Sequence, residues 1–134
     1  MKIEIFTLCD AATEDRGKLN LLGSFDHLMA RQAPVVHASC ALALKMRFAK
    51  TEEGSHQIRV TFIDEDGHEV LDALQVTVSV LVAPGESTAT SHIVLNIQQL
   101  KLPNFGEYSI DLAVDGREEG SLPLYVSQVV DRPG

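Results

Sequence analysis

The chain has 134 residues, of which 45% are hydrophobic and 22% charged, as expected for one folded domain and not for a disordered chain. A formal net charge of −8 disfavours nucleic acids and anionic membranes as partners, because binding either requires a surplus of Lys and Arg. Two cysteines do not make a disulfide scaffold, and Glu4 and Asp10 interrupt the first apolar run, so we expect no secretory signal, no membrane span and a cytoplasmic location.

Alternation of apolar and polar residues, the mark of a half-buried strand, begins near the start of the chain. Strands are predicted over 2–9 and 18–26, with Leu19, Leu21 and Phe25 on one face of the second. The segment Asp26–Arg31 (DHLMAR) is predicted to hold one short turn of helix. The longest strand is predicted over 36–48, where every second residue from Val36 to Phe48 is apolar and should face the core.

Further strands are predicted by the same alternation at 57–62, 74–82, 93–98, 107–114 and 122–126. Asp66-Gly67 and Asp115-Gly116 predict tight hairpin turns, because these residues tolerate positive φ. Pro123 cannot donate a ladder hydrogen bond, which predicts an edge strand or a bulge there. About eight strands separated by polar turns favour an all-β, two-sheet antiparallel β-sandwich over residues 1–130, followed by a frayed C-terminal tail at 131–134.

The stretch from Ile93 to Gly116 resembles the end of an immunoglobulin-like domain. Leu95, Ile97 and Leu100 match a strand of the form L-x-I-x-x-L, and Gly106 and Tyr108 match the tyrosine corner, where a buried hydroxyl bonds to upstream backbone. Ile110 stands where antibody domains have their second disulfide cysteine, so the resemblance implies the fold without that disulfide.

Three segments are together similar to a family of short, uncharacterised bacterial proteins carried as a domain of unknown function. They are the run from Ile3 to Gly23, the Asp64–Gly67 turn (DEDG) and the block from Gly106 to Gly116. The resemblance covers most of the chain. It implies a β-sandwich and supplies no activity, substrate or site residue.

Acidic loops are the first candidate site, because Ca²⁺ prefers several hard oxygen ligands. The turn at Asp64–Gly67 fails the EF-hand pattern, since Phe62 and Ala73 stand where carboxylates are needed, so we interpret it as an acidic hairpin turn. In an immunoglobulin-like strand order, three other loops share one end of the sandwich. That end could bind a divalent cation or a basic partner through six residues: Glu52, Glu53, Glu86, Asp115, Glu118 and Glu119.

Other chemistry finds little support in the sequence. The five histidines lack zinc-ligand spacing and are interpreted as surface or strand-face residues, with His37 and His92 on polar faces. Cys9 and Cys40 are predicted to be buried and therefore unreactive, and no cofactor motif is present.

The pattern favours a non-enzymatic interaction or structural module, with an unidentified protein partner or self-association as a homodimer. The alternative is a cation-dependent binder or enzyme that uses the acidic end. Leu81, Val94 and Tyr125 are predicted on outward faces, where they would mark an interface if contiguous.

Overall fold

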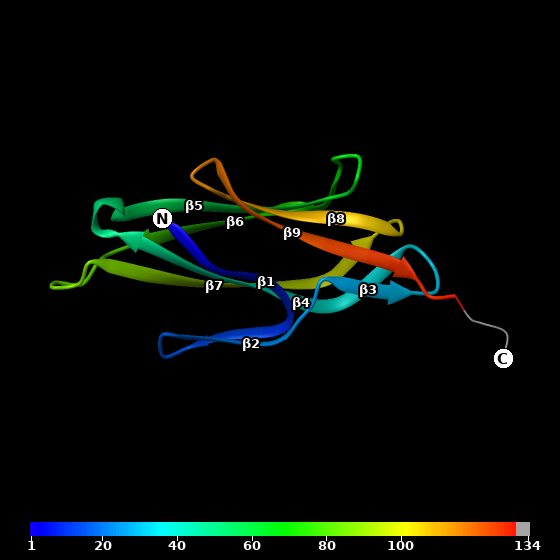
Figure 1. Ribbon diagram of the computed structural model, residues 1–134, viewed down its shortest axis with the longest axis horizontal. Coiled ribbons are helices and arrows are strands. Elements are labelled where there is room, and N and C mark those ends of the chain that lie inside the picture. Colours follow the sequence, from blue (N-terminus) through cyan, green and yellow to red (C-terminus); the bar gives the residue numbers. More distant parts are fainter. Residues whose placement is uncertain (131–134) are drawn as a thin grey trace.

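The structure, a computed structural model, describes residues 1–130, so the tail predicted at 131–134 lies outside the described residues. In that range nine strands form two sheets, of order β2-β1-β4-β7 and β3-β9-β8-β5-β6, which lie face to face in Figure 1. The bounds are β1 (Lys2–Asp15), β2 (Lys18–Ser24), β3 (His27–Ala30), β4 (Val35–Ala49), η1 (a 3₁₀ turn, Lys50–Glu52), β5 (Gly54–Ile63), β6 (Glu69–Val80), β7 (Thr88–Leu102), β8 (Gly106–Val114) and β9 (Arg117–Gln128).

The strand order confirms the immunoglobulin-like sandwich. Neighbours β1, β4 and β7 correspond to strands A, B and E, while β6, β5, β8 and β9 correspond to C′, C, F and G. The tyrosine corner is also present. The Tyr108 hydroxyl donates to the carbonyl oxygen of Asn104 at 2.6 Å and accepts the Asn104 N–H at 3.0 Å, while its ring is buried.

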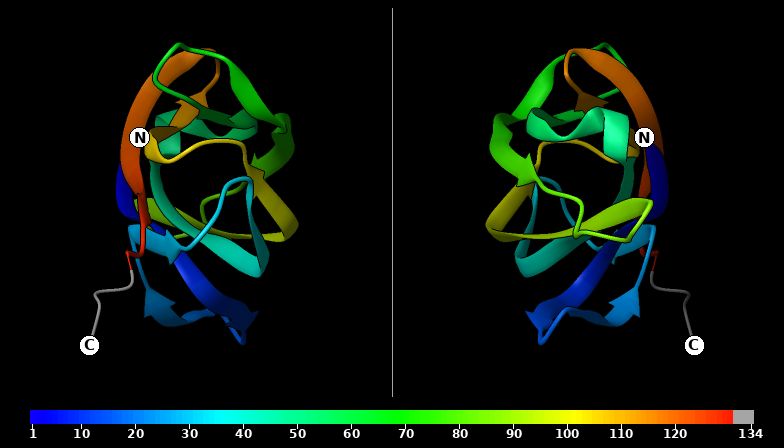
Figure 2. Two further views of the ribbon diagram at one scale, coloured as in Figure 1. Left: turned by 90° about the vertical axis from the view of Figure 1, so that its right-hand side faces the viewer. Right: turned by 90° about the vertical axis from the view of Figure 1, so that its left-hand side faces the viewer.

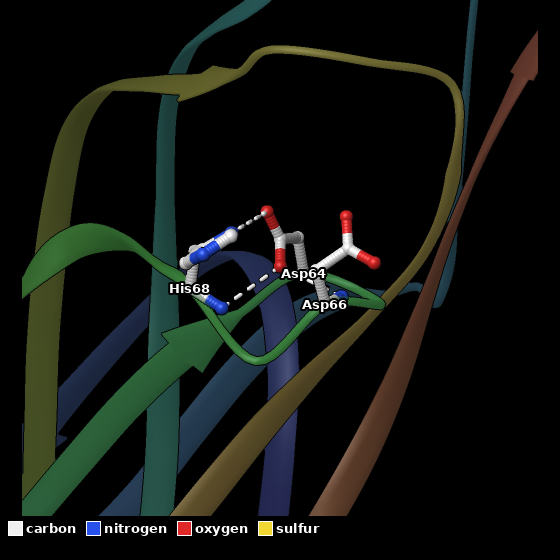
Figure 3. A group of neighbouring side chains, drawn as sticks. All are labelled: Asp64, Asp66 and His68. Carbon is white, nitrogen blue, oxygen red and sulfur yellow. Dashed lines mark hydrogen bonds and ion pairs between the residues drawn. The ribbon is translucent and has the colours of Figure 1, made fainter.

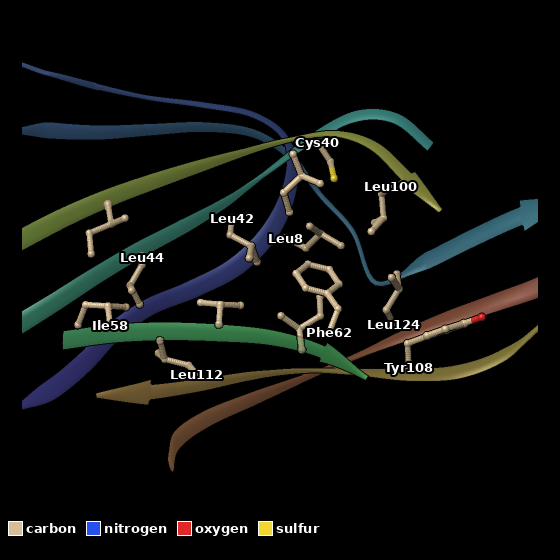
Figure 4. Close-up of a cluster of buried hydrophobic side chains, with 14 of the residues drawn as sticks. Leu8, Cys40, Leu42, Leu44, Ile58, Phe62, Leu100, Tyr108, Leu112 and Leu124 are labelled. Carbon is tan, nitrogen blue, oxygen red and sulfur yellow. The ribbon is translucent and has the colours of Figure 1, made fainter. Parts of the chain in front are cut away.

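The core lies between the two sheets, where the strands other than β2 each contribute apolar side chains (Figure 4). Many of its most deeply buried members lie on β4, β5, β8 and β9, each at most 2% exposed: Leu42, Leu44, Met46, Phe48, Ile58, Val60, Phe62, Ile110, Leu112 and Leu124. Burial of this many large aliphatic and aromatic side chains is the main driving force for the fold.

The predicted face of β4 is correct from Cys40 to Phe48 but wrong before it. Val36 is 51% exposed and Ala38 is exposed as well, whereas Val35 is buried. Ala38 lies opposite Gln99 of β7, which has a φ of 53°, in the left-handed region. This residue rotates the strand, so that both paired strands exchange inward and outward faces at the same place. Alternation within β4 carries no signal of the distortion in its partner.

The segment 10–24 forms a partial third layer beneath the β1-β4-β7 sheet. Strand β1 pairs with β4 over Lys2–Cys9, then bends and pairs with β2 over Cys9–Asp15 (Figures 1 and 2). Its small apolar cluster contains Cys9, Ala41 and Ala43, which are buried, and Ala12, Leu19, Leu21 and Val94, which are partly buried. The burial predicted for Cys9 is confirmed, although the residue lies outside the main core. Phe25 packs against the main core instead of sharing this face with Leu19 and Leu21.

The helical turn predicted at Asp26–Arg31 is wrong, because His27–Ala30 forms β3. This strand runs parallel to β9, so the sandwich is not antiparallel throughout. The backbone N–H of Tyr125 donates to the carbonyl oxygen of Asp26 at 2.8 Å, and that of Val129 donates to Ala30 at 2.9 Å. The edge of β9 therefore takes the hydrogen bonds that would have stayed within a helical turn.

Both predicted turns are confirmed. Asp115 and Gly116 have φ of 52° and 80° and join β8 to β9, and Gly67 has a φ of 82° between β5 and β6. Strand β3 pairs with β9 only from Tyr125 onward, so Pro123 occupies a stretch of β9 whose outer edge β3 leaves uncovered. Within residues 1–130, the structure has no helix with the length and apolar character needed to cross a membrane.

Candidate functional site

Three of the six predicted acidic residues come together at one end of the sandwich. Glu52, Asp115 and Glu119 line one depression with Met1, His56, Val114 and Arg117. Glu118 points elsewhere, into a depression that it shares with Arg59 and Asp111, while Glu53 and Glu86 are exposed. The loops therefore share an end as predicted, but the alternation of β9 places neighbouring Glu118 and Glu119 in different depressions.

His56 is the centre of this end, and the sequence analysis did not single it out. Its Nδ1 lies 2.6 Å from Oδ2 of Asp115, and its Nε2 lies 2.6 Å from the carbonyl oxygen of Glu52. Its side chain is 14% exposed and its ring packs 4.5 Å from that of Phe48. A carboxylate and a carbonyl only accept, so the imidazolium, in which both ring nitrogens donate, is the form of the ring that satisfies both contacts. The Glu52 carbonyl and then Asp115 raise the pKa of His56.

The two central carboxylates are bound to groups of the protein itself. Asp115 also accepts the Gln57 backbone N–H at 2.9 Å, and this bond and His56 hold the pKa of its carboxyl below the ordinary value. Glu52 accepts from the Met1 amine at 2.7 Å and from the Ala49 N–H at 2.9 Å, which lowers its pKa in the same way. With both its ring nitrogens donating, His56 has no lone pair to act as a base. Through His56, these hydrogen bonds connect η1 to the turn between β8 and β9. Cation binding by the six acidic residues stays a prediction.

A second acidic group lies at the opposite end, in the turn between β5 and β6. One polar atom from each of Asp64, Asp66 and His68 lies within 4.8 Å of the others (Figure 3). Oδ1 of Asp64 accepts the backbone N–H groups of Asp66 and His68, both at 2.9 Å, and the His68 bond is the main reason why its pKa is lowered. These bonds are those of a side chain that closes its own turn, as the interpretation of an acidic hairpin turn requires.

The cysteines are buried, and two of the histidines are partly buried. Burial raises the pKa of the Cys40 thiol to about 11 and raises that of Cys9, so neither is a ready nucleophile. His37 and His92, interpreted as surface or strand-face residues, are partly buried, and Nε2 of each is buried without a hydrogen-bond partner. His37 packs beside Phe25, and His92 lies close to Glu14 of β1. Both are covered by the segment that follows the bend in β1, which alternation in β4 and β7 does not reveal.

The three outward apolar residues predicted from the sequence do not form one patch. Leu81 follows β6 and is 80% exposed, whereas Tyr125 lies on β9 beside His27. Val94 is on the outer face of its sheet as predicted, but it packs against the cluster of Cys9, Ala41 and Ala43. These three residues therefore mark no common contact surface.

One side of the sandwich shows a feature that the sequence analysis missed. Strands β6 and β7 are each paired on one edge only, end their respective sheets, and are in contact with each other. The stretches 73–80 of β6 and 88–98 of β7 contain no Asp, Glu, Lys or Arg. We call these two stretches the β6–β7 side. The sequence signal was their lack of charge, but only the topology shows that both stretches are edges.

Some apolar side chains along the β6–β7 side are incompletely buried, although Val80, Ile93 and Ile97 on the same stretches are buried. Leu74, Val76 and Val78 of β6 and Leu95 of β7 face the core but are only partly buried, whereas Ile58 and Val60 on neighbouring β5 are 1% exposed. The main-chain edges of both strands and part of the core therefore face solvent together on this side.

Comparison with curated proteins finds no match. Among solved structures, an immunoglobulin-like protein from Pseudomonas aeruginosa is similar, with 13% sequence identity, a TM-score of 0.42, and coverage of 89% of this chain and 90% of that chain. Comparison with protein families matches residues 4–127 to one of them. Because this match spans nearly the whole chain, the protein belongs to DUF6941, a family of unknown function.

Proposed function

We propose that this protein is a non-enzymatic protein-interaction module that binds another polypeptide through its β6–β7 side. The observation that carries the proposal is the pair of long strand edges, adjacent, unpaired and without charged residues. An unpaired edge presents N–H and C=O groups that another chain can continue as a sheet.

The other outer edges support this choice. Proteins protect edges with short strands, Pro, Lys, bulges or a covering segment. Here β3 has four residues, β9 carries Pro123 where β3 does not cover it, and β2 begins with Lys18. The charge-free stretches of β6 and β7 contain neither Lys nor Pro. An edge without such protection is expected to be covered in the functional state.

The bound state of the titratable groups supports a role without catalysis. At the acidic end, His56 hydrogen-bonds to the Asp115 carboxylate and the Glu52 carbonyl, and the carboxylates of Asp115 and Glu52 each accept a backbone N–H, as structural residues do. The net charge of −8 supports a protein partner in preference to a nucleic acid. We further propose a bacterial, cytoplasmic setting, supported by two cysteines that are unpaired and buried.

The test is affinity capture from the native host with a variant that charges both edges. Thr90 and Ser79 are exposed on β7 and β6, so T90K/S79K adds a lysine to each edge without disturbing the core. The control T13K/T51K makes the same charge change at exposed positions on β1 and η1. We expect a stoichiometric partner, another protein or an untagged copy of this chain, on the wild type and the control but not on T90K/S79K. Equal capture by all three baits, or by none, would refute the proposal.

A further inference from the structure

We infer that the partner on the β6–β7 side is a second copy of this chain, which forms a two-fold symmetric dimer. The inference rests on the proposed function and names its partner. A two-fold axis perpendicular to the sheets would bring β7 against the partner's β7 and β6 against the partner's β6, each pair antiparallel. Both sheets would then continue across the dimer, and four exposed edges would become two paired ladders.

The spacing of the two edges favours another sandwich over a peptide. Edges β6 and β7 belong to different sheets, and packed sheets lie about 10 Å apart. An extended peptide adds one strand and covers one edge, leaving the other exposed. A body that covers both at once must carry two edges with the same separation and twist. A second copy meets this requirement without any further adjustment.

The size of the β6–β7 side is suitable for a stable dimer. Its stretch of β7 spans about 36 Å at about 3.3 Å per residue, and two sheets with their side chains are about 20 Å thick. The side therefore offers on the order of 700 Å² per copy, close to the roughly 800 Å² of a typical specific interface. The partly buried Leu74, Val76, Val78 and Leu95 would lose their remaining solvent contact there.

Charge explains why two copies would meet on this side. Each copy has 19 acidic and 11 basic residues, so two copies repel one another over most approaches. The stretches 73–80 and 88–98 contain no Asp or Glu, so a contact between them places no carboxylate of one copy opposite a carboxylate of the other. A contact through the acidic end or the Asp64 turn would bring carboxylates of the two copies together. The least repulsive side is thus also the side with unpaired edges.

The experiment is sedimentation equilibrium of the purified chain beside T90K/S79K and the control T13K/T51K. We expect twice the chain mass for the wild type and the control, and one chain mass for T90K/S79K, with a circular dichroism spectrum that shows the same strand content for all three. Hydrogen exchange of the wild type alone gives a second test that needs no variant. Edge amides within 88–98 should exchange more slowly in concentrated solution than after dilution.

A wild type that stays monomeric up to its solubility limit overturns the dimer, as does a T90K/S79K variant that still dimerises. The capture experiment separates the two proposals. A monomeric chain that captures a different protein through the lysine-sensitive side refutes the dimer and leaves the interaction module standing. A monomeric chain that captures nothing there refutes both.

Discussion

The hydroxyl of Tyr108 closes the chain between β7 and β8 by two hydrogen bonds to one residue, Asn104. Tyr108→Phe keeps the buried ring but leaves the Asn104 N–H and C=O without this partner. We expect a loss of about 1–3 kcal/mol in the free energy of unfolding, measured by urea denaturation. Tyr125→Phe is the matched control, because Tyr125 is 39% exposed and should change stability little. Equal losses in the two variants would show that the corner contributes nothing specific.

His56 makes stability depend on pH, with a sign that its environment determines. Its pKa is raised in the folded protein, so the stability that the imidazolium contributes is complete below the unfolded value of about 6.5. That contribution is lost as the pH rises through the higher folded pKa. We expect the melting temperature to fall over this window. The cause lies in the group formed by His56, Asp115 and the Glu52 carbonyl, together with Met1, Arg117 and Glu119, which line the same depression.

Asp115→Asn tests the cause of this shift. Asn tolerates the φ of 52° at position 115 and retains an acceptor for the Gln57 N–H, but it removes the negative charge beside His56. We expect NMR titration to show a lower pKa for His56 in the variant and a weaker fall in melting temperature above about pH 6.5. Asp64→Asn at the opposite end is the control, and it should leave the titration of His56 unchanged. An unchanged pKa in D115N would contradict the imidazolium assignment.

At the scale of elements, the hairpin of β1 and β2 is attached by one face only. Leu21 packs on the cluster of Cys9, Ala41 and Ala43, whereas its neighbour Leu22 is 74% exposed. We expect Leu21→Ala to cost about 1–2 kcal/mol and to speed hydrogen exchange through residues 10–24, because it leaves a cavity beneath the hairpin. Leu22→Ala should change stability by less than about 0.5 kcal/mol. Similar exchange in both variants would mean that the small cluster does not hold the hairpin.

Strand β3 shows how context decides the structure of a short element. The local sequence of residues 26–31 allows a helical turn, since it contains no Pro, Gly or β-branched residue. The free edge of β9 offers interstrand hydrogen bonds to the same backbone, and a single turn of helix is only marginally stable on its own. A four-residue segment therefore adopts the conformation that its neighbour in space can pair with.

For the whole molecule, the proposed dimer should respond to salt in a specific direction. Each copy carries a formal charge of −8, while the β6–β7 side carries no charged residue. Salt screens the long-range repulsion between copies and breaks no ion pair in the contact. We expect the dissociation constant to decrease as ionic strength rises towards physiological values, measured by sedimentation velocity. Weaker association in salt would indicate an interface held by ion pairs, and hence a different surface.

Alternation and turn residues in the sequence are sufficient to predict the all-β sandwich, most strands, both hairpin turns and the tyrosine corner. These features depend on residues a few positions apart, because alternate burial and positive φ each select particular residue types in the local sequence. The acidic end was predicted in part, because the positions of its loops follow from strand order. Its central residue, His56, was missed, since its partners lie four residues before it and in the turn after β8.

Other features were decided only when the chain folded. The reversal of face at Ala38 depends on Gln99 in the partner strand, and β3 depends on the free edge of β9. Contact with the hairpin leaves the outward-facing side chain of His92 only 10% exposed, with its Nε2 buried. The charge-free stretches of β6 and β7 became a candidate interface only because both end their sheets on the same side. Local patterns record which residues leave water, whereas the identity of a strand's neighbours, and so of its free edges, is a property of pairing between distant segments.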